Sequence, residues 1–118
     1  MSFLGMLGDD VAEELDLFVS FIRGNLSTIG RHIGWLRDLL GKYQELENYR
    51  VRGMVEDEIK LLEEIKVFKE RENIHGVLED IQDLSEKSID GAEGMGSVVK
   101  KLKRLLRADS GDLEDPGR

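Results

Sequence analysis

The sequence contains no cysteine, and among its 118 residues it has a single proline and only 6% aromatic residues. Without cysteine it can form no disulfide, no thiolate nucleophile and no Cys-ligated metal site, and we expect a cytoplasmic protein. No segment alternates polar and apolar residues as a strand does. No apolar run is long enough to span a membrane, and the N-terminus is not typical of a signal peptide. These absences favour an all-α protein.

Charged residues make up 36% of the chain, and acidic residues outnumber basic ones to give a net charge of -8. Nucleic-acid binding depends on basic surface, so we expect no nucleic-acid partner. One segment is the exception, because five cations cluster near the end of the last predicted helix. We interpret them as complementing the helix dipole and flanking the apolar stripe. They are Lys100, Lys101, Lys103, Arg104 and Arg107.

Apolar residues recur at spacings of three and four along residues 9–48, which predicts a long amphipathic helix. Asp9 or Asp10 could cap its start, with Glu13 completing a capping box. Two consecutive four-residue steps at Phe18, Ile22 and Leu26 form a stutter, which disturbs regular coiled-coil packing. The full stripe is Val11, Leu15, Phe18, Ile22, Leu26, Ile29, Ile33, Leu36, Leu40 and Tyr43.

Two further helices are predicted at residues 54–70 and 74–107, and Gly53 marks the end of the first. The stripe of the shorter, connecting helix is Val55, Ile59, Leu62, Ile65 and Phe68. The last helix contains Gly91, Gly94 and Gly96, although each costs about 1 kcal/mol of helix propensity relative to alanine. No strand precedes these glycines, so we interpret them as sites of close helix packing and not as a phosphate loop.

We therefore predict an apolar arm at residues 1–8, a helical domain at 9–108 and a flexible tail at 109–118. Two or three long helices of one small chain cannot enclose a large core. The predicted fold is a long antiparallel helical hairpin with a shorter connector helix, dimerising into a four-helix bundle. We expect the dimer core to contain Phe18, Ile22, Leu26, Ile29, Ile33, Leu36, Ile89, Met95 and Leu102.

No arrangement of residues indicates a self-contained enzyme. The two histidines, His32 and His75, lack the spacing that places two metal ligands on one helix face. Ser20 and Ser27 have no histidine and acid at a spacing typical of a hydrolase triad. A Walker lysine motif is also absent. We predict no metal, no cofactor and no catalytic residue.

Several segments resemble the dimerisation and histidine-phosphotransfer domain of sensor histidine kinases. Residues 20–29, SFIRGNLSTI, resemble its first helix, where the pattern reads His-Glu-aliphatic-Arg/Asn-Asn-Pro-Leu-Thr-Ser-Ile. Residues 73–81, NIHGVLEDI, and 84–95, LSEKSIDGAEGM, resemble the acidic run that opens its second helix. Residues 98–107, VVKKLKRLLR, resemble the end of that helix. The resemblance spans about positions 11 to 111 and implies a dimer of helical hairpins.

The sequence departs from this family at the residues that carry its chemistry. Ser20 stands at the phosphoacceptor position, Phe21 replaces the acidic neighbour, and Asn25 stands where proline is usual. Serine has no imidazole nitrogen to accept a phosphoryl group. The sequence also contains no ATP-binding domain, so we expect no autophosphorylation by this chain.

Three functions follow as hypotheses. The first is a degenerate, non-catalytic dimeric module that binds or scaffolds a response-regulator receiver or a histidine kinase. The resemblance places its partner-binding surface at Ser20, Phe21, Gly24, Asn25 and Thr28. The second is a phosphorelay histidine phosphotransferase that uses His32, or less favourably His75. The third is a structural or regulatory helical dimer unrelated to two-component signalling.

Overall fold

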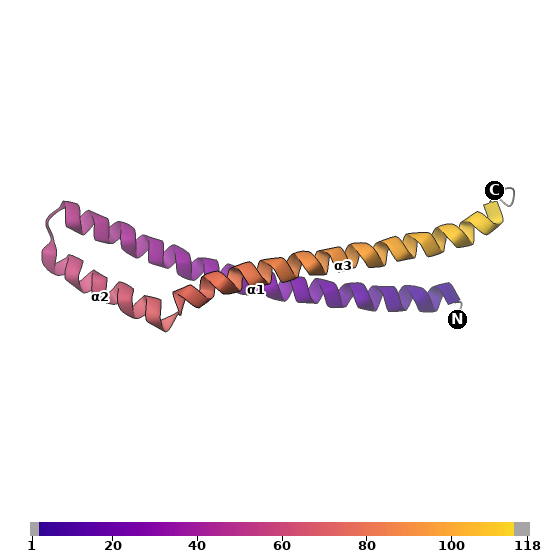
Figure 1. Cartoon of the computed structure of the whole chain (residues 1–118), viewed down its shortest axis with the longest axis horizontal. Coiled ribbons are helices and arrows are strands. Elements are labelled where there is room, and N and C mark those ends of the chain that lie inside the picture. Colours follow the sequence, from indigo (N-terminus) through magenta and orange to yellow (C-terminus); the bar gives the residue numbers. More distant parts are fainter. Residues whose placement is uncertain (1–2, 115–118) are drawn as a thin grey trace. The chain divides into compact units, whose positions relative to one another are not determined.

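A computed structural model describes residues 3–114 and consists of three helices, α1 (Phe3–Val51), α2 (Val55–Arg71) and α3 (Ile74–Glu114) (Figure 1). Within these residues there is no strand. The prediction of an all-α protein is therefore confirmed.

The outer helices extend further than the sequence pattern indicated. α1 begins at Phe3, so Asp9 and Asp10 lie inside the helix and cap nothing, and the predicted apolar arm is helical from Phe3 onward. α3 runs on to Glu114, which makes residues 109–114 of the predicted tail helical. The rest of the predicted arm and tail, residues 1–2 and 115–118, lies outside the described residues.

The chain divides into two compact units. Unit 1 comprises residues 1–25 and 86–118, and unit 2 comprises residues 26–85. The division between Asn25 and Leu26 falls at the end of the stutter that the sequence places at Phe18, Ile22 and Leu26.

Unit 2 holds most of the buried apolar side chains. In it, α2 returns beside the end of α1 (Figure 1) and presents Leu61, Ile65 and Phe68 to the core. This differs from the predicted stripe of α2, because Val55, Ile59 and Leu62 are exposed. The core cluster is Leu39, Leu46, Leu61, Ile65, Phe68 and Ile74, with Trp35, Leu36 and Tyr49 packed against it.

The turn between α1 and α2 is a Schellman motif. The backbone N–H of Met54 donates to the carbonyl of Tyr49 at 2.9 Å, and that of Gly53 donates to the carbonyl of Arg50 at 3.2 Å. These two bonds satisfy carbonyls that the end of a helix leaves unpaired. Gly53 has a φ of 69°, the left-handed conformation that only glycine adopts without cost.

We expect Gly53→Ala to lower the free energy of unfolding by about 1 kcal/mol. A Cβ atom at this position meets no other atom within 4 Å, so the cost comes from backbone conformation and not from a clash. Urea denaturation measures it, and Gly53→Asn, which tolerates positive φ better, should cost less than Gly53→Ala. Equal losses for both substitutions would contradict this explanation.

Unit 1 is built from the first part of α1 and the last part of α3. A Cβ atom on Gly94 would lie 2.7 Å from the ring of Phe18, and one on Gly91 would lie 3.2 Å from Ile22. The prediction of close packing is confirmed at these two glycines. It is wrong at Gly96, where a Cβ atom meets nothing within 4 Å. Among the apolar side chains of unit 1 that the structure describes, only Val98 is buried.

Candidate interaction surface

A groove of about 690 Å³ lies on unit 1 between α1 and α3. Its walls are largely apolar. Leu17 is 72% exposed and Phe21 is also exposed, and Gly91 has no side chain that would cover the rings of Phe18 and Phe21. The lining residues are Glu14, Leu17, Phe18 and Phe21 from α1, and Lys87, Asp90 and Gly91 from α3. An exposed apolar groove with charged residues at its edge is the kind of surface that binds another protein.

The predicted partner-binding residues all belong to α1 but fall in both units. Ser20, Phe21 and Gly24 are exposed in unit 1, and Phe21 lines the groove. Asn25 is partly buried, and its side-chain nitrogen is buried without a hydrogen-bond partner in the described residues. Thr28 belongs to unit 2, where its hydroxyl accepts a hydrogen bond from Arg31 at 3.4 Å. Phe21 is thus the predicted residue that contributes most directly to the groove.

The predicted dimer-core residues of unit 2 form two rows on α1. Ile29 and Leu36 are partly buried. Leu26 and Ile33, however, are 56% and 45% exposed, and Leu40, seven residues further on, is 63% exposed. Leucine and isoleucine at a seven-residue spacing supply one of the two apolar positions in the heptad of a coiled coil. Among the described residues, Leu26, Ile33 and Leu40, here called the α1 seam, are therefore covered only in part.

The predicted dimer-core residues of unit 1 are less exposed. Phe18, Ile22, Met95 and Leu102 are partly buried, and only Ile89 is exposed. Phe18 and Ile22 pack on the two glycines of α3, so they contribute to the contact between the helices of one chain.

The two histidines differ sharply in environment. His32 is only 8% exposed, its ring stacks on Trp35 with centroids 5.1 Å apart, and its Nδ1 has no hydrogen-bond partner in the described residues. His75 is exposed in the first turn of α3 and lines a groove of about 490 Å³ that also contains Lys66 and Lys69. The sequence favoured His32 as the phosphoacceptor, but exposure favours His75.

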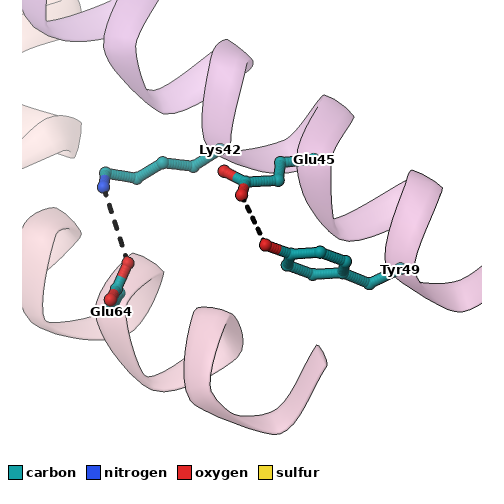
Figure 2. A network of polar contacts seen from close by, with 4 residues as sticks. All are labelled: Lys42, Glu45, Tyr49 and Glu64. Carbon is teal, nitrogen blue, oxygen red and sulfur yellow. Dashed lines mark hydrogen bonds and ion pairs between the residues drawn. The ribbon is translucent and has the colours of Figure 1, made fainter. Parts of the chain in front are cut away.

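A small polar network joins α1 and α2 in unit 2 (Figure 2). The hydroxyl of Tyr49 donates a 2.6 Å hydrogen bond to Glu45, and Lys42 lies 3.9 Å from Glu64 of α2. The hydrogen bond to Glu45 raises the pKa of Tyr49 above its ordinary value of 10.0, because a phenolate could neither donate to the carboxylate nor lie comfortably beside it.

We expect the raised pKa of Tyr49 to make the chain less stable as the pH rises above 10.0. The native state holds the phenol proton more tightly than the unfolded state, so its contribution is complete below the unfolded pKa and is lost as the pH passes the native pKa. Ultraviolet titration of Tyr43→Phe, which leaves Tyr49 as the only tyrosine, measures the shift directly. A midpoint at or below 10.0 would contradict it, and Glu45→Gln should bring the midpoint down.

Phe68 lies beside two cationic groups, a contact that the sequence pattern did not indicate. Its buried ring lies 5.8 Å from the ammonium group of Lys42 and 5.5 Å from the guanidinium of Arg71, both within the range of cation–π attraction. Arg71 is one turn further along α2, and that spacing was visible in the sequence. Lys42 comes from α1, so no local pattern could indicate it.

The part of the chain that the structure describes contains no group of three or more metal-ligating side chains. It also contains no helix that is both long enough and apolar enough to cross a membrane. No protein-family model, curated protein or solved structure matches this chain.

Proposed function

We propose that this chain is a non-catalytic, dimeric protein-interaction module. The observation that carries the proposal is the α1 seam, because large aliphatic side chains in a heptad row are costly to leave in water. Full burial of one leucine or isoleucine side chain contributes roughly 1.5–3 kcal/mol. A second copy of the chain, packed seam to seam, would cover three such residues on each helix.

The test of dimerisation is the double variant Leu26→Glu with Ile33→Glu. We expect the unchanged chain to have twice the mass of one chain in light scattering after size exclusion, and the double variant to have the mass of one. Two buried, unpaired carboxylates at the seam would oppose association strongly. The matched control is Ile59→Glu with Val55→Glu, which places the same charges on exposed aliphatic positions of α2.

If the double seam variant is still a dimer, the interface lies on another face of the chain. A chain that is monomeric without any substitution would refute the proposed dimer. Circular dichroism of both variants shows whether the helices remain folded, so that loss of dimer can be separated from unfolding.

The groove on unit 1 supports the second part of the proposal, a partner from two-component signalling. A receiver domain or a histidine kinase is the expected partner, because residues 20–29 resemble the first helix of histidine-kinase dimerisation domains. Leu17 and Phe21 supply exposed apolar anchors, and aromatic anchors in pockets contribute strongly to binding between proteins.

Binding of purified receiver domains from the same cell tests this partner. We expect Phe21→Ala to weaken binding at least tenfold, a loss typical of an aromatic anchor. Val67→Ala, an exposed aliphatic truncation on α2, is the control and should have no effect. If no receiver or kinase binds, the dimer is a structural or regulatory protein unrelated to two-component signalling.

The exposure of His75 favours one alternative, a phosphorelay transferase that uses this histidine. Lys66 and Lys69 line the same groove and would attract a phosphorylated partner. The alternative predicts that labelled phosphate passes from a phosphorylated receiver to this chain and that His75→Ala abolishes the transfer. His32→Ala tests the other histidine, because it should abolish the transfer only if His32 accepts the phosphoryl group. Receiver binding that persists in the double histidine variant, with no transfer in the unchanged chain, supports the non-catalytic module instead.

A further inference from the structure

The segment of α3 from Val98 to Arg107 concentrates positive charge in an acidic chain. Its ten residues include five cations and no anion, although the whole chain has a net charge of -8. All five cationic side chains are exposed. None of them forms an ion pair with a carboxylate whose side chain the structure describes. The segment is therefore an exposed cationic surface.

The dipole of the helix does not explain these cations. α3 continues to Glu114, and its last turn contains no basic residue. The dipole acts only within the last turn of a helix. Arg107, the cation nearest the end of α3, lies about two turns before Glu114. The interpretation of the cluster as a dipole complement is therefore wrong, and another reason for its charge is needed.

Four of the five cations of this segment occupy the side of α3 opposite Val98, whereas Lys101 lies about 60° from Val98. Val98 is buried, and at 100° per residue Lys100, Lys103, Arg104 and Arg107 lie roughly 140–240° around the axis from it. Leu105, Leu106 and Val99 lie within about 100° of Val98. All three are nevertheless exposed, and Leu106 and Val99 lie at the border of the cationic side. The segment is thus a basic amphipathic helix with aliphatic residues beside its charges.

Three of the five acidic residues of α1 in unit 1 lie away from this surface, whereas Asp10 and Glu14 lie within about 80° of Phe18. Phe18 faces α3 through its contact at Gly94, and Asp9, Glu13 and Asp16 lie on the opposite side of α1 by helical periodicity. The two helices of unit 1 therefore carry opposite charges on their outer sides. Packed helices lie about 8–10 Å apart, so these carboxylates are at least one screening length from the cations at physiological salt.

We propose that this side of α3 docks on an anionic lipid surface. Clusters of four to eight lysines and arginines on an amphipathic helix attract anionic headgroups, and the bordering Val99 and Leu106 can enter the interfacial layer. A flat surface touches only the outer side of α3 and leaves the acidic side of α1 in solvent. Residues 98–107 contain no aromatic side chain to stack on bases, so the segment suits lipid better than single-stranded nucleic acid.

Sedimentation of the full chain with vesicles tests the proposal. One set of vesicles is phosphatidylcholine alone, and the other contains about one third phosphatidylserine, which supplies the negative surface potential. We expect binding to the anionic set only, weakened at high salt. Each cation contributes roughly fivefold in affinity, so the triple variant Lys100→Gln, Lys103→Gln and Arg107→Gln should lower binding about a hundredfold.

The matched control is the triple variant Lys60→Gln, Lys66→Gln and Lys69→Gln, which changes the net charge by the same amount on exposed positions of α2. Its binding should fall much less than that of the α3 variant. Equal losses of vesicle binding in the two variants would show that binding depends on net charge alone and would overturn the proposal. So would equal binding to both sets of vesicles, or no binding to either.

Two further results would assign the cations to another partner. If the α3 variant is monomeric in the absence of vesicles, the cations stabilise the dimer. If the chain binds single-stranded RNA more tightly than vesicles and the α3 variant abolishes that binding, the partner is a nucleic acid. Either result would overturn the lipid assignment.

Discussion

Phe68→Ala is expected to lower the free energy of unfolding of unit 2 by about 3–5 kcal/mol, the usual cost of removing a buried phenylalanine. Phe68 is only 7% exposed and belongs to the core cluster of that unit. Its removal also leaves Lys42 and Arg71 without the ring that they approach. Urea denaturation followed by tryptophan fluorescence measures the loss, because Trp35 is the only tryptophan and packs against this core.

The control for this substitution is its neighbour on the same helix. Val67 is 49% exposed, and Val67→Ala should change stability by no more than about 0.5 kcal/mol. Phe68→Leu should recover a large part of the stability because it keeps most of the buried apolar volume. Similar losses at positions 67 and 68 would mean that α2 turns a different face to α1. Protein concentration must be held constant in all these measurements, since a dimer couples stability to concentration.

Gly94→Ala and Gly96→Ala are expected to have opposite effects, although both replace a glycine of α3 by alanine. At Gly94 the new Cβ atom would lie 2.7 Å from the ring of Phe18, so α1 and α3 must separate or the ring must move. Overpacking of this kind costs about 1–3 kcal/mol. At Gly96 nothing lies within 4 Å, and alanine should stabilise the helix by up to about 1 kcal/mol.

Circular dichroism measures both variants, because Trp35 lies in unit 2 and does not report directly on unit 1. The double variant Gly94→Ala with Phe18→Leu tests the cause of the loss. A smaller side chain at position 18 should restore part of the stability, as expected for two residues in contact. If Gly94→Ala is as favourable as Gly96→Ala, close packing at Phe18 does not limit the approach of the two helices.

The sequence predicted the positions of the helices well, but it predicted only in part which face of each helix is buried. The spacing of apolar residues favours Leu62 for the stripe of α2, whereas Leu61 is the buried residue. Two adjacent leucines fit a helical period almost equally well, and only the position of α1 decides between them. Aspartate commonly caps helices, which predicts a helix start at Asp9 or Asp10, yet the chain before these residues contains no proline and α1 begins at Phe3.

The candidate surfaces were also only partly predictable. Phe21 was singled out from the resemblance to histidine-kinase domains, and it lines the groove of unit 1. The groove residues Lys87, Asp90 and Gly91 come from α3, about 66–70 residues away from Phe21 in sequence, so no local pattern connects them to it. The burial of His32 was likewise hidden, because a histidine beside an apolar stripe is compatible with either side of a helix.

The sequence by itself determined that the chain is helical, that its helices are amphipathic and that Gly53 ends the first, because these properties depend on residues within a few turns of one another. The tertiary structure decided which apolar residues are covered. It buries Leu61, Ile65 and Phe68 but leaves Leu26, Ile33 and Leu40 in solvent, although all six belong to similar repeating patterns. Burial depends on which helix lies alongside, and that contact joins residues far apart in the chain.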